Sequence, residues 1–354
     1  MEAANLTKLG NSLQVPSVQE LVKEKSVMVP IRYIRSDQEP VVLSSTDLLE
    51  VPVIDMGILL DGDSMDAELS KLHQACKDWG FFQLINHGVS NLLLDKVKTE
   101  VEQFFKMPLE DKNKFGQLEG DIEGYGQHFV VSNEQKLDWA DIFYMITLPT
   151  DLRKPHLLPR LPQSFRDAIE AYSVELKSLA MKILNLMAKA LKMDPEEFKV
   201  LFEEGMQSMR TNYYPPCPQP EHVIGLAPHS DATGLTILHQ LNEIEGLQIK
   251  KDGIWIPIKP LPSAFVINIG DVMEVVTNGI YRSIEHRGVV NSVKERMSIA
   301  TFLSPKLDGE FGPAPSIISS QAPPKFKRIA SADFFKGYFV QKLVGKCYLD
   351  TLRI

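Results

Sequence analysis

The chain of 354 residues is 44% hydrophobic and 24% charged, which is ordinary for a globular protein and ample for a large core. Its formal net charge of −8 leaves no basic footprint, so neither nucleic acid nor a membrane is an expected partner. The three cysteines are odd in number and far apart, which favours a reducing compartment over a disulfide framework. Met1–Asn5 lacks a signal-peptide pattern and no stretch has the length of a membrane span, so we expect a cytoplasmic protein. We further expect it to act as a monomer.

The N-terminal part of the chain predicts an irregular arm followed by alternating helices and strands. The arm would carry one short helix near Val18–Lys25. Apolar residues at helical spacing between Asp66 and Trp79 predict an amphipathic helix, and Gly80 would end it as a left-handed cap. Further expected elements are strands at 51–55, 81–85 and 142–146, a helix over 93–104 and a short helix at 110–114.

The second half of the chain predicts a long helix and then many short strands. Apolar residues between Ser164 and Lys192 recur with a period of about 3.6, which indicates an amphipathic helix. We expect strands at 208–214, 223–227, 235–240, 246–250, 254–258, 264–269, 282–286 and 296–303. So many short strands at this spacing predict a sandwich or jelly roll. We interpret Gly270-Asp271 as a turn and expect a last helix from Ser331.

A candidate metal site lies in this strand-rich region. His229 and Asp231 are two positions apart, so on one extended strand their side chains would share a face and reach one ion. His286 on a later strand would supply a third ligand. Two neutral imidazoles and one carboxylate leave the opposite side of the metal open, as in non-haem Fe(II) oxygenases.

Strand alternation places an anion-binding group beside this metal site. Arg296, Ser298, Ala300 and Phe302 share one strand face, and Arg210, Asn212 and Tyr214 share another. A face with an arginine and a phenylalanine suits a cavity that receives an anion and an apolar body. If a dianionic 2-oxo acid chelated the metal, its second carboxylate would need a cation, and the fork of Arg296 matches a carboxylate. The Ser298 hydroxyl and the Tyr214 phenol would complete this anchor.

These residues resemble the plant 2-oxoglutarate/Fe(II)-dependent dioxygenases, over nearly the whole chain from about Val15 to Ile354. The stretches that carry the resemblance are His229-x-Asp231, His286, Arg296-x-Ser298, Asn212–Pro218, Gly246-Leu247-Gln248 and Trp79–Gly88. Other stretches are similar to the branch with the senescence-related dioxygenase, the dioxygenase-type norcoclaurine synthase and the alkaloid O-demethylases. They are Val15–Leu21, Gln135–Asp141 and Leu352-Arg353-Ile354.

The resemblance implies a mixed α/β fold with a mainly β core, a distorted double-stranded β-helix wrapped by helices. It implies an oxidoreductase that requires Fe(II), 2-oxoglutarate and O2, with ascorbate as a candidate reductant and succinate and CO2 as products. By position, His229, Asp231 and His286 match the iron ligands, while Arg296, Ser298, Tyr214 and Asn212 match 2-oxoglutarate-binding residues. Candidate substrate contacts are Tyr125, Phe129, Arg210, Thr233 and Phe302. We interpret His87 as a turn residue, and His73, His128, His156, His222 and His239 as surface or packing residues.

We divide the chain into five segments on this basis. They are an N-terminal arm (1–50), an N-terminal dioxygenase region (51–160), a long helical scaffold (161–205), the β core (206–304) and a C-terminal segment with a helix (305–354).

The expected reaction is hydroxylation or oxidative O-demethylation of a small aromatic specialised metabolite, with an alkaloid favoured. A flavonoid-type hydroxylase or desaturase is the first alternative. A non-catalytic small-molecule-binding protein of the same fold is a second, although an intact metal triad and anion anchor argue against it. A zinc hydrolase is a third, but the sequence lacks a His-Glu-x-x-His helix and an evident general base.

Overall fold

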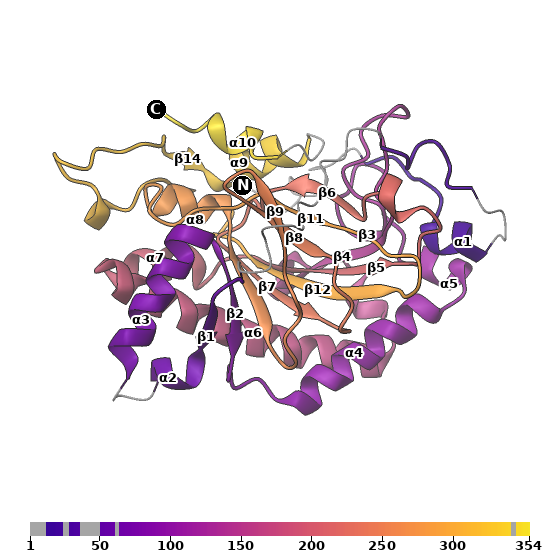
Figure 1. Cartoon of the computed structure of the whole chain (residues 1–354), viewed down its shortest axis with the longest axis horizontal. Helices are drawn as coiled ribbons and strands as arrows, with labels where there is room; N and C mark the ends of the chain where they lie inside the picture. The colour runs from indigo at the N-terminus through magenta and orange to yellow at the C-terminus, as the bar shows by residue number, and fades with distance from the viewer. Residues whose placement is uncertain (1–11, 24–27, 36–49, 61–63, 341–344) are drawn as a thin grey trace.

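The structure is a computed structural model that describes residues 12–23, 28–35, 50–60, 64–340 and 345–354. Two sheets form its centre (Figure 1). The larger sheet has the strand order β1-β2-β10-β7-β12-β5-β4-β3, and the smaller has the order β6-β11-β8-β9. The strands are β1 (Val53–Asp55), β2 (Phe81–Ile85), β3 (Gly124–Gly126), β4 (Asp141–Leu148), β5 (Gln207–Tyr214), β6 (Leu226–His229), β7 (Leu235–Gln240), β8 (Leu247–Lys251), β9 (Ile254–Pro257), β10 (Phe265–Ile269), β11 (His286–Gly288), β12 (Arg296–Leu303) and the pair β13 (Glu310–Phe311) and β14 (Ile329–Ala330).

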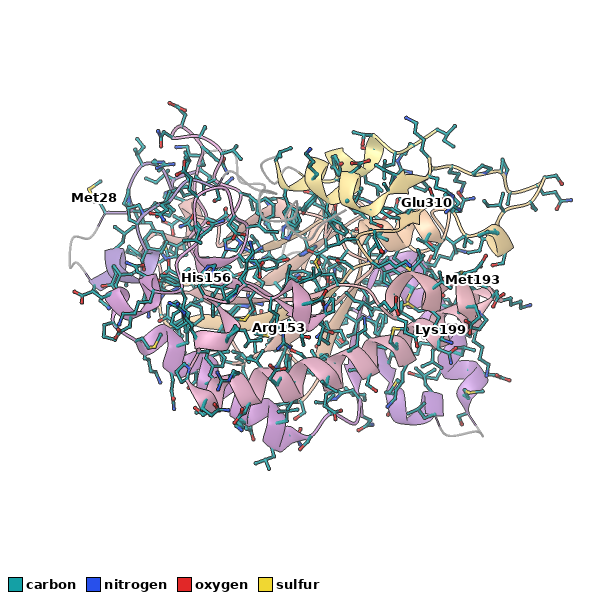
Figure 2. The ribbon with its side chains drawn as sticks, turned by 180° about the vertical axis from the view of Figure 1, so that it is seen from behind. Met28, Arg153, His156, Met193, Lys199 and Glu310 are labelled. Atoms are coloured by element: carbon teal, nitrogen blue, oxygen red, sulfur yellow. The ribbon has the colours of Figure 1, made fainter. Side chains whose placement is uncertain are left out.

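Helices surround this pair of sheets. The α-helices are α1 (Val18–Lys23), α2 (Met56–Leu60), α3 (Met65–Gln74), α4 (Asn91–Lys106), α5 (Leu109–Asn113), α6 (Gln163–Leu191), α7 (Pro195–Phe202), α8 (Asp271–Val276), α9 (Ser331–Phe339) and α10 (Cys347–Asp350). The short helical segments are η3 (Ala75–Trp79), η4 (Thr150–Leu152), η5 (Leu158–Arg160), η6 (Pro220–His222) and η7 (Pro315–Ile317). Figures 1 and 2 show α4 and α6 along one side of the large sheet, while α9 and α10 lie on the opposite side of the molecule.

Strand alternation divides the large sheet into two apolar faces. On β7 and β12, Ile237 and Ile299 belong to the core shared with the helices α4 and α6. Their neighbours Leu238 and Ala300 point the other way and pack with Ile249 of the small sheet. The two sheets therefore enclose an interior of their own, and the cavities described below lie in it.

Most predicted elements are present, and their ends are close to those expected. The strands at 81–85, 235–240 and 296–303 coincide with β2, β7 and β12. The helix that begins near Asp66 continues through the π-helical turn η3, and Gly80 ends it with φ of 62°. The predicted helix near Val18–Lys25 is α1 as far as Lys23, and its last two residues lie outside the described ranges.

Two predictions around the second iron-ligand candidate are wrong. Asp271 does not form a turn but begins the buried helix α8, whose first amide donates a 2.7 Å hydrogen bond to the Asp231 carbonyl. The strand expected at 282–286 begins only at His286. The segment before it cannot pair as a strand, because its amides bond elsewhere: Arg282 donates to the Cys76 carbonyl and Ser283 donates to the Glu274 carboxylate.

Two of the five predicted segments, residues 51–160 and 206–304, supply the strands of the large sheet. Strands β1 and β2 extend the sheet from β10, and β3 and β4 extend it from β5 on the other side. The arm is also attached to the sheet, because the Val18 and Gln19 amides donate to the Asp141 carboxylate on β4 at 2.9 and 3.0 Å. The segments pack together, and the boundaries between them remain a prediction from the sequence.

Glu123 is a buried carboxyl group whose ionisation opposes folding. It lies just before β3, and its Oε2 accepts a 2.7 Å hydrogen bond from the Ile146 amide. Burial raises the pKa of Glu123 to about 7. Because the folded protein holds this proton more tightly than the unfolded chain, stability decreases as the pH rises through the range between the ordinary carboxyl pKa and 7.

We expect Glu123→Gln to become more stable than the parent protein as the pH rises, because glutamine keeps the acceptor and cannot ionise. The difference in free energy of unfolding should grow from about pH 4.5 to 7, to about 3 kcal/mol at most. Urea unfolding of both proteins at pH 5 and pH 8 measures it. Glu119→Gln, at an exposed position, is the matched control. The same pH dependence in parent and Glu123→Gln proteins would contradict the assignment.

Candidate active site

Three metal-binding side chains meet between the small and the large sheet. His229 is the last residue of β6 and stands opposite His286, the first residue of β11, so their rings lie 4.3 Å apart. Asp231 Oδ1 lies 3.6 Å from His229 Nε2 and 3.7 Å from His286 Nε2. One ligand atom from each residue lies within 4.8 Å of the others, which suits a single metal ion.

Asp231 reaches this position differently from the way the spacing predicts. The strand ends at His229, so Asp231 lies beyond it. The backbone there is held from outside, because the Ser230 amide donates to the Gly345 carbonyl at 3.3 Å and the Asp231 carbonyl accepts from Asp271. The Asp231 carboxylate and the His229 imidazole therefore meet as predicted. The carboxylate is positioned by a loop that hydrogen-bonds to Gly345 and Asp271, and not by the strand.

Backbone carbonyl groups orient both imidazoles. His229 Nδ1 lies 2.8 Å from the Ala227 carbonyl, and His286 Nδ1 lies 3.2 Å from the Ile284 carbonyl. A carbonyl oxygen can only accept, so each Nδ1 carries the proton and each Nε2 presents a lone pair to the others. Burial lowers the pKa of His286 to about 4, which keeps this imidazole neutral.

Asp231 is held as a carboxylate in this buried place. Its Oδ2 accepts hydrogen bonds from Thr236 Oγ1 at 2.7 Å and Asn268 Nδ2 at 2.8 Å, so Oδ1 faces the imidazoles. Burial opposes ionisation, and the hydrogen bond from Asn268 is one of the contacts that hold the pKa of this carboxyl below its usual range. Two neutral nitrogen donors and one anionic oxygen donor fit Fe(II).

A cavity of about 490 Å³ extends from the three metal-binding residues toward the predicted anion anchor. On its wall Arg296 of β12 pairs in register with Tyr214 of β5, and Ser298 pairs with Asn212. Arg296 is 3% exposed, and its Nη2 donates to Gln240 Oε1 at 3.2 Å. Within the described residues, the buried atoms Arg296 Nε and Asn212 Oδ1 have no hydrogen-bond partner. The guanidinium of Arg296 can donate to a carboxylate, which fits a small dicarboxylate chelated at the metal.

Gly246 leaves the space that Arg296 occupies, a role that the sequence motif does not reveal. A Cβ atom at this position would lie 2.6 Å from Arg296 Cδ and 2.8 Å from the Val289 carbonyl oxygen. Both distances are shorter than real Cβ contacts, so a side chain here must displace the arginine or the strand beside it.

We expect Gly246→Ala to raise the KM for 2-oxoglutarate about tenfold, because a shifted Arg296 loses about 1.4 kcal/mol of interaction with the far carboxylate. The kcat at saturating co-substrate should change little. Steady-state succinate formation over a range of 2-oxoglutarate concentrations separates the two parameters. Gly57→Ala, whose Cβ would approach Asp55 and Asn86 away from the site, is a control. An unchanged KM for 2-oxoglutarate would show that Arg296 does not depend on this space.

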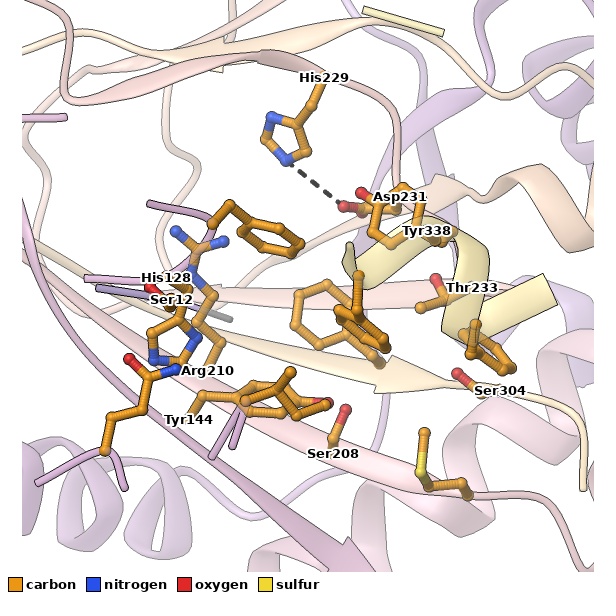
Figure 3. Close-up of a pocket in the computed structure, with 18 of the residues that line it drawn as sticks. Ser12, His128, Tyr144, Ser208, Arg210, His229, Asp231, Thr233, Ser304 and Tyr338 are labelled. Atoms are coloured by element: carbon orange, nitrogen blue, oxygen red, sulfur yellow. Dashed lines mark ion pairs between the residues drawn. The ribbon is translucent and has the colours of Figure 1, made fainter. Parts of the chain in front are cut away.

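A larger cavity of about 790 Å³ reaches His229 and Asp231 from another side (Figure 3). Four predicted substrate contacts line it: Phe129, Arg210, Thr233 and Phe302. Tyr125, the fifth, does not. Its ring packs on Phe104, and its hydroxyl lies 3.3 Å from Ser17 Oγ, so Tyr125 is buried against the arm and away from the cavity.

Other residues of the cavity wall were not predicted. The helix α9 contributes Phe335, Tyr338 and Phe339, and Phe129 stacks on Phe339 with ring centres 5.9 Å apart. The sequence spacing of Phe335, Tyr338 and Phe339 indicates that they share one face of the helix. It does not indicate that this face lines the cavity. His128, expected as a surface or packing residue, also lines the cavity.

The C-terminal segment also braces the metal-binding residues. The Tyr338 hydroxyl donates to the Ser230 carbonyl at 3.1 Å. Lys346 Nζ lies 2.7 Å from the Glu274 carboxylate and 2.6 Å from the Ser283 carbonyl, close to the strand that begins with His286. The same segment therefore contributes to the cavity wall and contacts the loop that carries Asp231 and the segment that precedes His286.

Comparison with known families agrees with this geometry. Residues 205–305 match the 2OG-Fe(II) oxygenase superfamily, and residues 51–161 match the family described as non-haem dioxygenase in morphine synthesis N-terminal. The chain belongs to the 2OG-Fe(II) oxygenase superfamily, and it is an oxidoreductase that uses Fe(II) and 2-oxoglutarate with a double-stranded β-helix core.

Its relatives include plant O-demethylases. The chain is 59% identical to oxoglutarate-dependent flavonoid 7-O-demethylase 1 of Ocimum basilicum, over all of this chain and 95% of that protein. It is 51% identical to codeine O-demethylase of Papaver somniferum over the full length of both. The crystal structure of JOX2 in complex with 2OG, Fe and JA superposes with a TM-score of 0.88 at 33% identity, over 97% of this chain and 98% of that one. Among the described helices, none has the length and apolarity that crossing a membrane requires.

Proposed function

We propose that this enzyme O-demethylates or hydroxylates a methoxylated aromatic metabolite bound in the larger cavity. The observation that carries the proposal is that this mainly apolar cavity, walled by Phe129, Phe302, Phe335 and Phe339, opens onto His229 and Asp231. The names of the relatives support it, because they act on flavonoids and on codeine. We further propose that the protein is cytoplasmic, works as a monomer and has no nucleic-acid partner.

Each candidate residue has a role in this proposal. Iron would be held by His229, Asp231 and His286, and 2-oxoglutarate by Arg296, Ser298, Tyr214 and Asn212. When bound, Fe(II) with 2-oxoglutarate and O2 supplies the oxidant for a C–H bond, with succinate and CO2 as products. The buried guanidinium of Arg296 neutralises the far carboxylate, and the aromatic wall excludes water around the carbon to be oxidised.

O-demethylation and hydroxylation are the same oxidation applied to different carbons. Hydroxylation of a methoxy carbon gives a hemiacetal, which releases formaldehyde and leaves a phenol. The residues around the metal need only present the correct carbon, and the cavity wall decides which one this is. The codeine relative supports the alkaloid class that the sequence favours, and the basil relative supports the flavonoid alternative.

A screen of methoxylated alkaloids and flavonoids tests the proposal. We expect at least one compound to stimulate succinate release and to yield formaldehyde in equal amount, only when Fe(II) and 2-oxoglutarate are both supplied. Succinate release without formaldehyde would identify hydroxylation instead of O-demethylation. Tight binding of a compound without any succinate would contradict an enzymatic role and favour the binding-protein alternative.

A further inference from the structure

One corner of the larger cavity is polar, in contrast to its phenylalanine-rich remainder. Figure 3 shows the side chains of His128 and Arg210 next to each other in this corner, with Tyr144 and Ser208 nearby. The sheet register brings them together, because Arg210 on β5 pairs with Tyr144 on β4. The His128 ring packs edge-on against the Tyr144 ring, with centres 5.7 Å apart.

Arg210 is a buried cation that forms no ion pair among the described residues. Its side chain is 7% exposed. Within the described ranges, no carboxylate forms an ion pair with it, and its buried Nε has no hydrogen-bond partner. A buried guanidinium without such partners is unfavourable unless a ligand supplies an acceptor. The corner therefore offers hydrogen-bond donors to whatever occupies the cavity.

His128 offers an acceptor in the same corner. Its Nε2 lies 3.3 Å from the Gly124 carbonyl oxygen, which can only accept, so Nε2 carries the proton. Burial, reinforced by the charge of Arg210, lowers the pKa of His128 to about 3, so the imidazole is neutral. Its Nδ1 is then an acceptor, and among the described residues none donates to it.

A donor and an acceptor side by side complement a hydroxyl group better than any other common substituent. A hydroxyl donates to Nδ1 and accepts from the guanidinium at the same time. A carbonyl or ether oxygen can use only Arg210, and a carboxylate or phenolate would meet the lone pair of Nδ1. A protonated amine would be repelled by the guanidinium.

We propose that His128 and Arg210 together bind a free hydroxyl group of the substrate. The preferred substrate is then a partly methylated phenol, which carries a hydroxyl for this corner in addition to the methoxy group that is oxidised. The methoxy part of this inference rests on the proposed O-demethylase function, whereas the hydroxyl-binding corner does not.

Paired ligands test the hydroxyl site directly. Each pair consists of a methoxyflavone or methoxylated alkaloid with one free hydroxyl and the same compound with hydrogen at that position. Dissociation constants are measured by calorimetry on the protein with Fe(II) and 2-oxoglutarate in the absence of oxygen. We expect the hydroxyl member of at least one pair to bind about tenfold or more tightly, which is the effect of one well-satisfied hydrogen-bonding group.

Variants assign this preference to residues. His128→Leu places an apolar side chain in the position of the imidazole and removes the acceptor, so the preference should decrease to about twofold or less. His128→Asn, whose amide oxygen can replace Nδ1, should restore part of the preference for the hydroxyl compound. Arg210→Met should weaken this preference. Ser304→Ala is the control, because Ser304 lies on the same cavity wall away from this corner in Figure 3 and should leave the preference unchanged. Unchanged affinity of His128→Leu for the compound without the hydroxyl shows that the cavity is intact.

Two results would overturn the inference: no pair shows a preference in the parent protein, or His128→Leu keeps the full preference. Formaldehyde release from the same compounds in air distinguishes this failure from that of the proposed function. Formaldehyde with equal affinity for both members contradicts the hydroxyl site alone. A clear preference that depends on His128, without formaldehyde from any compound, contradicts O-demethylation alone.

Discussion

Asp231→Ala is expected to reduce substrate-dependent succinate formation more than about 100-fold. Loss of a residue that merely supports a metal ligand typically lowers metal affinity or activity 10- to 100-fold, and loss of a ligand should exceed that. The substitution removes the only anionic donor among the three, and it leaves Thr236 and Asn268 without the oxygen that accepts their hydrogen bonds. Two neutral imidazoles alone cannot balance the charge of Fe(II).

Iron content and succinate formation, measured on the same preparation, check this expectation. His222→Ala is the matched control, because His222 is an exposed histidine on the short helix η6, where its Nε2 lies 3.7 Å from Glu221 Oε1. It should keep both iron and activity. Retention of iron and turnover by Asp231→Ala would contradict the assignment of the metal site. Loss of both by His222→Ala would indicate that the assay reports folding instead.

The sequence alone was sufficient to predict residues whose geometry follows from strand alternation. Arg296, Ser298 and Phe302 line the cavities from one face of β12, as the period of two requires. Tyr213, on the opposite face from Asn212, packs on Phe105 instead of lining the cavities. Alternation is local, so it can be read without knowing what lies across the sheet.

The sequence could not predict what depends on distant contacts. The expected strand at 282–286 has residues that suit a strand, but the Ser283 amide donates to the Glu274 carboxylate instead of to a neighbouring strand. No local sequence pattern indicates this contact. Tyr125 lies in a glycine-rich stretch that suits a binding loop, yet contacts with the arm bury it. His128 was expected as a surface or packing residue, yet it lines the cavity. Its position beside Arg210 arises only when β4 and β5 pair.

The C-terminal helix illustrates the same limit at the level of a whole element. The helix was predicted to start near Ser331, and it begins there. That this helix would close over the metal-binding residues depends on Tyr338 reaching Ser230 and on Lys346 reaching Glu274. Each contact joins residues that are many positions apart. The substrate cavity is for this reason less predictable than the metal site.

Arg296→Met is expected to raise the dissociation constant for 2-oxoglutarate more than about 100-fold. Removing one member of a buried, hydrogen-bonded charge pair costs about 3 kcal/mol or more, which corresponds to this factor. Arg296→Lys should be intermediate, because lysine keeps the charge but not the two-pronged geometry. The parent enzyme should strongly prefer 2-oxoglutarate over a 2-oxo acid without the far carboxylate, and Arg296→Met should lose most of that preference.

The stability of Arg296→Met distinguishes binding of 2-oxoglutarate by Arg296 from a purely structural role. A structural role predicts that the free variant unfolds at a lower temperature than the parent protein, and a binding role does not. In the absence of 2-oxoglutarate its guanidinium is a desolvated cation, and burial lowers its pKa, so the charge itself destabilises the folded state. Methionine has a similar length and no charge, so the free Arg296→Met protein should unfold at the same temperature or higher, while 2-oxoglutarate no longer stabilises it. Calorimetric titration with 2-oxoglutarate and thermal unfolding with and without it measure both effects. A lower unfolding temperature together with retained 2-oxoglutarate affinity would show that Arg296 supports the sheet and does not bind the co-substrate.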